Sequence, residues 1–393
     1  MKLAVPTNWQ PDLVKRIKKP GVDVVYGKLN SDFVGGGRPA CTSPEVRMQE
    51  AKKHVKEIHD NGLKFNYLLN AACLGNHEWT IRGQRRLRKL LTWLTDIKAD
   101  GVVVSVPYLA QFIRKNYPHF TIVASCLALV DSVEKAIFWE DLGANVITMS
   151  QHEMTRDFKL LREIKSHVKC ELQLIVNDNC IKDCPFYIYH HNLIAHSSQN
   201  FRPAGIFVFD YCRFFCRYKI LSEPGSFIKA AWIRPEDISV YEGVGINRFK
   251  VVDRNMTSDA ISFITDAYSK RSYNGNLYDL FGNPSKSLWF KKFDPVHRLK
   301  YFFHPFKLNV FKLMKMGAVL KDLEVFIDNT KLGGFIDYFL KNESCRYKAC
   351  SECGYCKNIE ESVVTIAPGY REEIASQYGH FIDESVSGAI FKY

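Results

Sequence analysis

Short apolar runs alternate with amphipathic stretches from residue 1 to about residue 255. Eight runs are rich in Val, Ile, Leu and Phe, as buried strands are, and the stretches between them carry apolar residues three and four positions apart, as helices on a core do. The eight predicted strands are residues 2–6, 22–26, 64–69, 102–106, 120–124, 145–149, 171–176 and 246–252. Strands that alternate with helices in this way predict a parallel sheet.

Several intervening helices carry end signals. Ser43 and Pro44 are predicted to begin one helix, as N-cap and first-turn proline, and Gly62 to end it. Its predicted inner face is Met48, Ala51, Val55 and Ile58. A second helix is predicted between residues 131 and 143, and Thr155 is predicted to cap a third.

The predicted fold class is α/β: a (β/α)8, TIM-like barrel over residues 1–270, with a mainly helical, cysteine-rich extension over residues 271–393. An open, doubly wound sheet is the alternative. No GxGxxG follows the first strand, and the glycines at 35–37 are interpreted as a flexible loop. In the extension, one helical core face is predicted, with breaks at Pro305 and Gly333-Gly334. It consists of Phe302, Phe306, Val310 and Leu313.

Charge adds the expectation of an anionic partner. Lys and Arg number 54 against 42 Asp and Glu, a net charge of +12. The basic run at residues 82–91 is interpreted as the solvated face of a helix, although RNA binding stays open. No run approaches the roughly 18 to 20 apolar residues of a membrane span, and no signal peptide is visible. A cytoplasmic location with reduced thiols is therefore expected.

Eight of the twelve cysteines form two groups with ligand-like spacing. The first group is Cys180, Cys184, Cys212 and Cys216; the second is Cys345, Cys350, Cys353 and Cys356. The second group has the compact CxxCxxC spacing of iron–sulfur loops, and Cys345 could supply a fourth ligand. Zinc is the alternative at both sites. Cys170 precedes the seventh strand and is predicted to be structural.

The region around the seventh strand resembles a known family. The stretches ELQLIVNDNCIKDCPFYIYHHN, FDYCRFFCRYK and WIRPEDISVYEGVGINRFKVVDR, preceded by TIVASCLALVDSVEKAIFWEDLGANVITMSQHE, are similar to the peptidase U-32 family, which has collagenase-like members and includes the ubiquinone-biosynthesis proteins UbiU and UbiV. The CxxxCP at residues 180–185 departs from the usual family signature, which has a longer gap between cysteines, and resembles an uncharacterised subgroup.

The resemblance implies an oxygen-independent, hydroxylase-like redox enzyme with a 4Fe-4S cluster. Cys180, Cys184 and Cys212 lie where family members place thiolates, and Cys216 or Cys41 would be the fourth ligand. With the tail group, one or two clusters are expected, and two would indicate electron transfer to or from a partner. Prephenate is an implied oxygen donor in members that act on nucleic acid.

Catalytic candidates are polar residues expected after the strands. Arg254 matches a family arginine that ends the eighth strand, and its planar fork suits a carboxylate; pairing with Glu242 is the structural alternative. Asp178, with His152 and Glu153 as acid–base residues, completes the set. The substrate class stays open among small carboxylates, peptides and RNA. Alternative functions are a peptidase, for which the chain offers no HExxH or GxSxG motif, and a metal-stabilised RNA-binding protein.

Overall fold

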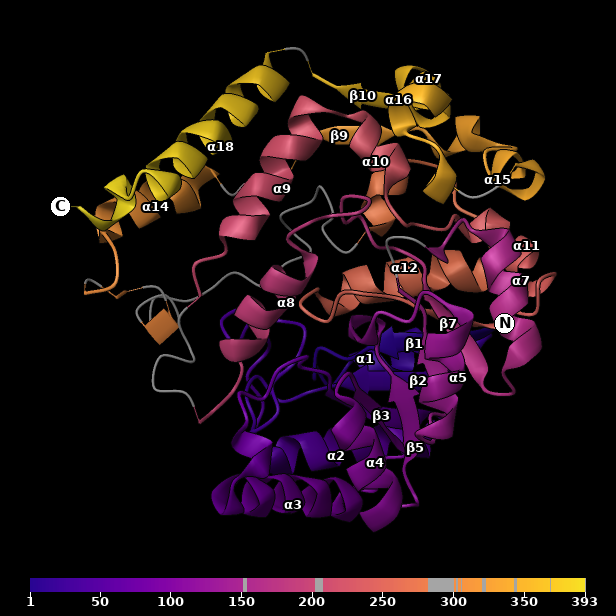
Figure 1. Cartoon of the computed structure of the whole chain (residues 1–393), viewed down its shortest axis with the longest axis vertical. Coiled ribbons are helices and arrows are strands. Elements are labelled where there is room, and N and C mark those ends of the chain that lie inside the picture. Colours follow the sequence, from indigo (N-terminus) through magenta and orange to yellow (C-terminus); the bar gives the residue numbers. More distant parts are fainter. Residues whose placement is uncertain are drawn as a thin grey trace.

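The computed structural model describes residues 1–150, 154–201, 208–281, 300–301, 303–304, 306–319, 323–342, 345–367 and 369–392. Eight parallel strands close into a barrel, with β1 paired to both β2 and β8 (Figure 1). They are β1 (Lys2–Pro6), β2 (Val22–Gly27), β3 (Lys64–Leu69), β4 (Gly101–Val104), β5 (Thr121–Ala124), β6 (Val146–Thr148), β7 (Glu171–Ile175) and β8 (Arg248–Lys250). The predicted barrel is confirmed, and every strand end lies within two residues of its predicted position.

Helices cover the outside of the barrel because their apolar stripes pack on the outward faces of the strands. They are α1 (Leu13–Ile17), α2 (Met48–Asp60), α3 (Ile81–Asp96), α4 (Pro107–Asn116), α5 (Val133–Asp141), α7 (Phe158–His167), α11 (Ile238–Glu242) and α12 (Ser258–Lys270). The basic run lies on α3, whose buried face includes Leu87 and Leu94, so it is a helix face as interpreted. No helix in the described part of the chain is long and apolar enough to span a membrane.

Two predicted helix starts are wrong, because hydrogen bonding and not residue type alone fixes the cap. Helix α2 begins at Met48, after Arg47 rather than Ser43, and Met48 is 46% exposed instead of facing inward. Helix α7 is capped by Asp157, whose side chain accepts from the Leu160 backbone N–H, and not by Thr155. Gly62 ends α2 at a φ of +75° as predicted.

The glycines at 35–37 form a packed segment, which corrects the prediction of a flexible loop. Gly35 has a φ of +80°, and a Cβ there would lie 2.8 Å from the carbonyl oxygen of Ala195. A Cβ on Gly36 would lie 2.9 Å from Oδ1 of Asn70. Glycine is required here because the chain passes close to backbone and side chains that a Cβ would displace.

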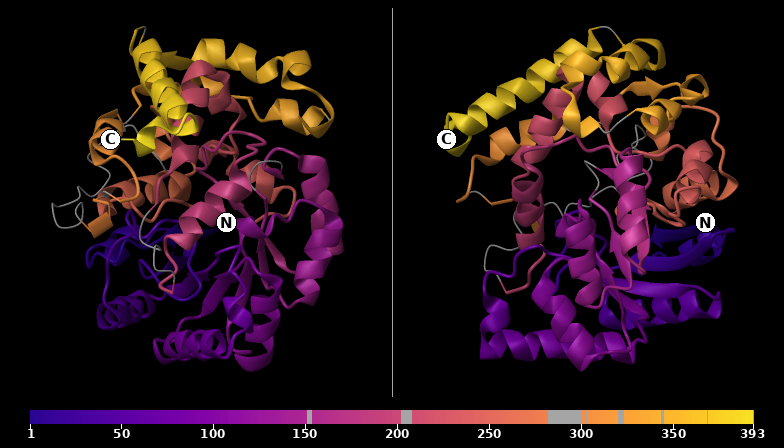
Figure 2. Two further views of the ribbon diagram at one scale, coloured as in Figure 1. Left: turned by 60° about the vertical axis from the view of Figure 1, so that its left-hand side comes forward. Right: turned by 45° about the vertical axis from the view of Figure 1, so that its right-hand side comes forward.

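A long connection between β7 and β8 and the C-terminal extension pack together at one end of the barrel (Figures 1 and 2). The connection contains α8 (Tyr187–His196), α9 (Tyr211–Ser222) and α10 (Gly225–Lys229). The extension contains α14 (Val310–Val319), β9 (Val325–Ile327), α15 (Asp337–Lys341), α16 (Cys350–Cys353), α17 (Tyr355–Val363), β10 (Val364–Ile366) and α18 (Tyr370–Val386). Helix α18 lies along α9, and α17 packs on α10.

The helical core face predicted in the extension is wrong where the structure describes it. Phe306 is fully exposed, and Val310 and Leu313 are only partly buried; Phe302 and Pro305 lie outside the described residues. The extension is instead anchored by α18, from which Tyr378 and Phe381 pack against Phe214 of α9. Aromatic contacts at other positions therefore supply the packing.

Burial of His54 predicts a specific loss of stability in acid. His54 on α2 packs edge-on against Trp9 and lies 2.8 Å from the Thr7 hydroxyl, and burial lowers its pKa to about 4. An unfolded histidine takes up a proton near pH ~6.5. Between about pH 6.5 and 4 only the unfolded chain binds this proton, so the free energy of unfolding should fall by about 2 to 3 kcal/mol as the pH falls. Urea unfolding at pH 7 and pH 4.5 measures this loss.

The control for this prediction is a pair of glutamine variants. His54→Gln removes the titrating group while retaining polar atoms near Thr7, so it should flatten the pH dependence, whereas His119→Gln alters an exposed histidine and should not. Equal slopes for the wild type and His54→Gln would show that His54 is not responsible.

Candidate functional site

Arg254, which follows β8, is a buried cation with free donors. It is 3% exposed, and its Nη2 donates to the Ser43 hydroxyl at 3.4 Å. Among the described residues its Nε and Nη1 have no hydrogen-bond partner. Burial lowers the pKa of Arg254, although Asp253 opposes that shift. A buried guanidinium with unused donors suits an anion, because a carboxylate accepts two parallel N–H bonds from it.

Further cations surround Arg254. Arg38 donates to Asp253 at 2.7 Å, and Lys250 is 7% exposed with its Nζ 4.3 Å from the centre of the Tyr26 ring. Burial, together with the charges of Arg254 and Arg38, lowers the pKa of Lys250 to about 8, while Cys126 opposes this shift. Three cations therefore share the end of the barrel with the Asp253 carboxylate, which leaves net positive charge for an anionic ligand.

A buried ion pair on the segment after β2 supports this end of the barrel. Lys28 pairs with Asp32, which also accepts a hydrogen bond from the Tyr67 hydroxyl at 2.8 Å. The other oxygen of Asp32 accepts from the backbone N–H groups of Val34 at 2.9 Å and Gly35 at 2.7 Å. Burial lowers the pKa of Lys28 to about 8, with Asp32 acting in the opposite direction. Asp32 thus fixes the course of the chain toward Arg38.

The remaining catalytic predictions have separate outcomes. Asp178 is buried after β7, and its Oδ1 accepts from the Cys180 backbone N–H at 3.3 Å. His152 and Glu153 lie outside the described residues. The alternative that Arg254 pairs with Glu242 is wrong: Glu242 binds the N-terminal amine and Arg271, each at 2.8 Å.

The first cysteine group is brought together by α9 and the loop that follows β7. Burial raises the pKa of Cys212 to about 12 and that of Cys216 to about 11, and the charge of Cys184 adds to both shifts. The charge of Cys216 likewise raises the pKa of Cys180. These mutual effects link the four thiols electrostatically, and the metal site that their spacing predicts stays a prediction.

Aromatic and polar contacts hold the loop of residues 180–184 against α9. The Phe186 ring lies 4.7 Å from the Phe215 ring and 6.0 Å from the Tyr211 ring. His190 on α8 binds Asp210 at 3.0 Å, next to the start of α9.

Cys41 occupies a different environment from this group. It packs with Ala40 and Tyr301 in a small buried cluster. Burial raises the pKa of Cys41 to about 12, and Asp210 adds to the shift. Cys170 is buried at the opposite end of the barrel, before β7, as predicted. Of the two candidates for the fourth position, Cys216 shares its surroundings with Cys180, Cys184 and Cys212.

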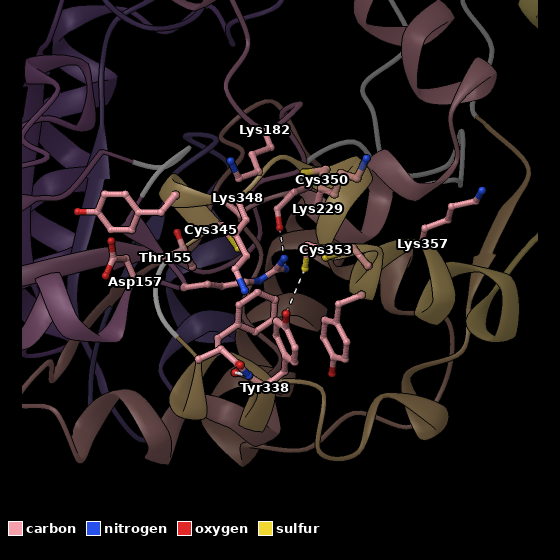
Figure 3. Close-up of a pocket in the computed structure, with 18 of the residues that line it drawn as sticks. Thr155, Asp157, Lys182, Lys229, Tyr338, Cys345, Lys348, Cys350, Cys353 and Lys357 are labelled. Atoms are coloured by element: carbon pink, nitrogen blue, oxygen red, sulfur yellow. Dashed lines mark hydrogen bonds between the residues drawn. The ribbon is translucent and has the colours of Figure 1, made fainter.

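The second cysteine group lines a cavity of about 370 Å³, the tail cavity (Figure 3). Cys345, Cys350, Cys353 and Cys356 all contribute to its wall. The Tyr338 hydroxyl lies 3.1 Å from the Cys353 sulfur, and the Tyr338 ring stacks on Tyr355 at 3.9 Å. Burial raises the pKa of Cys356 to about 11, while the charge of Arg156 opposes this. Four thiols from one short segment therefore face one cavity.

Arg156 is a partly buried cation near these thiols. Its guanidinium donates to the carbonyl oxygens of Ile228 and Ala230, both at 2.7 Å, and lies 4.6 Å from the Trp232 ring centre and 4.8 Å from that of Phe335. Its charge acts on Cys345 and Cys356. A fixed positive charge at this position stabilises thiolates, the form in which cysteine binds metal.

The two cysteine groups meet at Lys182. This residue lies between Cys180 and Cys184 in the chain, yet it lines the tail cavity and its charge acts on Cys345. Figure 3 shows Lys182 above Cys345. The loop that carries two thiols of the first group is thus part of the wall around the second.

The donor chemistry of both groups fits an iron–sulfur cluster or zinc. All eight cysteines are free thiols. Within the described ranges, no three His, Cys, Asp or Glu side chains are already arranged so that they could hold a metal ion. Binding would require the sulfurs to close around the metal and to release their protons, because thiolates are the ligands.

Comparison with known sequences finds a match to one family. Residues 14–184 match Peptidase family U32. An uncharacterized protease of Methanocaldococcus jannaschii is 28% identical over 352 residues, which cover 90% of this chain and 91% of the relative. The chain is therefore similar to this family over its first half and to the archaeal relative over most of its length.

Two further relatives are more distant. The tRNA hydroxylation protein P of Haemophilus influenzae is 23% identical over 173 residues, 42% of this chain and 36% of the relative. The solved structure of the U32 peptidase Mk0906 is 24% identical, with a TM-score of 0.42, over 52% of this chain and 83% of that one. The similar proteins are named for two different reactions, so their names do not fix the activity of this chain.

Sequence reasoning missed several charged residues of the site. Arg38, Lys250, Arg156 and Lys182 were not predicted, because nothing in their local pattern distinguishes them from solvated cations. Cys126 is also buried near the barrel end, and Lys250 lowers its pKa although burial raises it overall. The one available signal was position: Lys250 ends β8 and Cys126 follows β5, where barrel enzymes place functional groups.

Proposed function

We propose that this chain is an iron–sulfur redox enzyme, hydroxylase-like and oxygen-independent, that acts on an anionic substrate or co-substrate at the C-terminal end of the barrel. The observation that carries the proposal is the position of Arg38. Its charge acts on Arg254, Lys250 and the Cys180 thiol, so the anion-binding cations and the first cysteine group share one neighbour. A bound anion would lie beside a redox centre.

Some of these residues would bind the anion, and others would hold the loop that carries the cysteines. Arg254 would hold a carboxylate with the free Nε and Nη1 donors, and Arg38 and Lys250 would stabilise its charge. Asp178 fixes the Cys180 backbone through its Oδ1. A 4Fe-4S cluster held by Cys180, Cys184, Cys212 and Cys216 would supply one-electron chemistry when bound. His152 and Glu153 remain the predicted acid–base pair.

Similarity to a protein named for tRNA hydroxylation supports this proposal. Against peptide hydrolysis, which the name of the archaeal relative suggests, stands the lack of an HExxH or GxSxG motif in the sequence. The net charge of +12 agrees with an RNA substrate, and a salt-titrated tRNA-binding assay tests that extension. Weak binding without sequence preference would count against RNA as the substrate.

Anaerobic purification tests the metal chemistry directly. A brown protein with iron and acid-labile sulfide near about four or eight per chain is expected, for one or two clusters. Removal of the metal by a chelator should bleach the colour. A colourless protein with stoichiometric zinc would overturn the redox proposal.

A further inference from the structure

We infer that a small acidic electron-carrier protein docks on the lysines around the tail cavity and exchanges electrons with the protein at the tail cysteines. These residues, named here the lysine rim, are Lys182, Lys229, Lys341, Lys348 and Lys357. The inference rests on the proposed function and names the partner that such a function needs.

The first support for this docking site is the excess of positively charged side chains around the tail cavity. Five lysines and the partly buried Arg156 line the cavity, whereas Asp157 is its single acidic lining residue, and that carboxylate caps α7. In the described part of the chain, Lys182 is the one rim lysine that forms an ion pair, with Asp183. The rim therefore presents several unpaired positive charges, which attract an acidic surface over long range.

The position of the rim around the cysteines is the second support. Lys341, Lys348 and Lys357 are exposed, and so is Cys350 on α16. Figure 3 shows Lys182, Lys229, Lys348 and Lys357 around Cys345, Cys350 and Cys353. A carrier drawn to these lysines would approach an exposed edge of the cysteine group and not a distant surface.

The chemistry of the rim favours a protein over RNA. Arginine, with its planar fork, is the residue suited to bidentate phosphate recognition, whereas lysine is a point charge on a flexible stem. The cavity's arginine is partly buried, and its two terminal nitrogens donate to backbone carbonyls. Flexible point charges around a redox site suit a transient encounter steered by electrostatics.

The electron acceptor at the tail site would be an oxidised 4Fe-4S cluster held by Cys345, Cys350, Cys353 and Cys356. In each encounter the reduced carrier would lose one electron and this cluster would gain it, with no bond formed or broken and no proton transferred. Lys182 of the 180–184 loop lines the same cavity, so the tail site adjoins the loop that carries two thiols of the first group.

Stopped-flow reduction of the full, anaerobically purified chain tests the inference, with a reduced acidic [4Fe-4S] ferredoxin as the probe. The variant carries Lys229→Gln, Lys348→Gln and Lys357→Gln. At low ionic strength it should be reduced about tenfold or more slowly than the wild type, and the wild-type rate should fall steeply with salt. A matched control carries Lys52→Gln, Lys53→Gln and Lys89→Gln on the exposed faces of α2 and α3 and should match the wild type.

Three further readouts separate the explanations. Iron content and the rate of reduction by dithionite should be the same in all three proteins; absence of iron from the wild type would instead refute the proposed function. Binding of the ferredoxin, followed by fluorescence anisotropy, does not require iron and should weaken in the rim variant alone. The inference would be overturned if the rim and control variants bound ferredoxin equally well and were reduced at equal rates. It would also be overturned if the rim variant lost tRNA binding but kept ferredoxin binding.

Discussion

Replacing Cys180 or Cys216 with alanine is expected to remove about four irons per chain, whereas Cys41→Ala should leave the iron content unchanged. The reason is proximity: Cys216 and Cys180 each respond to the charge of another thiol in the first group, while Cys41 packs against Tyr301 in a separate cluster. Iron and sulfide analysis after anaerobic purification, with visible absorption, measures the effect.

The tail group gives an independent loss in the same assay. Cys353→Ala should remove a second set of about four irons and leave the first, because its thiol lines the tail cavity. Cys170→Ala is the control, since Cys170 is buried before β7, at the opposite end of the barrel from the cysteines that follow this strand. Iron loss with Cys353→Ala but not with Cys180→Ala would remove the first group from the proposal. Loss with Cys41→Ala would reassign the fourth ligand.

Arg254→Met should abolish anion binding and yet stabilise the free protein. A buried cation with two unpaired donors costs free energy, so an apolar side chain of similar length should raise the free energy of unfolding by about 1 to 3 kcal/mol. A carboxylate that pairs with Arg254 should in turn lose about 2 to 5 kcal/mol of binding energy in the variant, at least a 30-fold weaker affinity. Thermal unfolding with and without a dicarboxylate such as prephenate or malonate measures both effects.

Arg248→Met on β8 is the matched control. Arg248 binds Glu171 at 2.8 Å and Asp23 at 3.0 Å at the other end of the same strand. Its replacement should destabilise the protein, because it leaves Asp23 unpaired and Glu171 with Lys2 alone, but should preserve the response to the dicarboxylate. A dicarboxylate response that survives in Arg254→Met, or a loss of stability in that variant without ligand, would contradict the assigned role of Arg254.

The barrel could be predicted because its signals are local. Each strand is a short apolar run, and each run was found within two residues of its observed ends. Helix starts were less accurate: Ser43 and Pro44 have the right residue types, but the chain there remains outside α2, which begins only at Met48. Residue type states what a cap can do, whereas the course of the chain decides whether a helix begins there.

Helical spacing in the extension was misleading for a related reason. Phe306 and its neighbours recur as a core face would, yet Phe306 is fully exposed, because no described element covers it. Periodicity shows that apolar residues share one face of a helix; burial requires a second surface. In the extension it is α18 that is buried in this way, because it packs on α9 of the β7–β8 connection.

The amino-acid sequence alone determined the eight strands, the positions of the cysteines relative to those strands and the compact spacing of the tail thiols, because each follows from residues near one another in the chain. Tertiary structure decided what lies next to what. Closing the barrel left Arg254 buried with free donors beside Arg38, and the folding of α9 brought Cys216 close enough to Cys180 for its charge to raise the pKa of that thiol. It also brought Lys182 to the tail cysteines, which are more than 160 residues away in the chain. Such contacts depend on long-range packing, which no local pattern encodes.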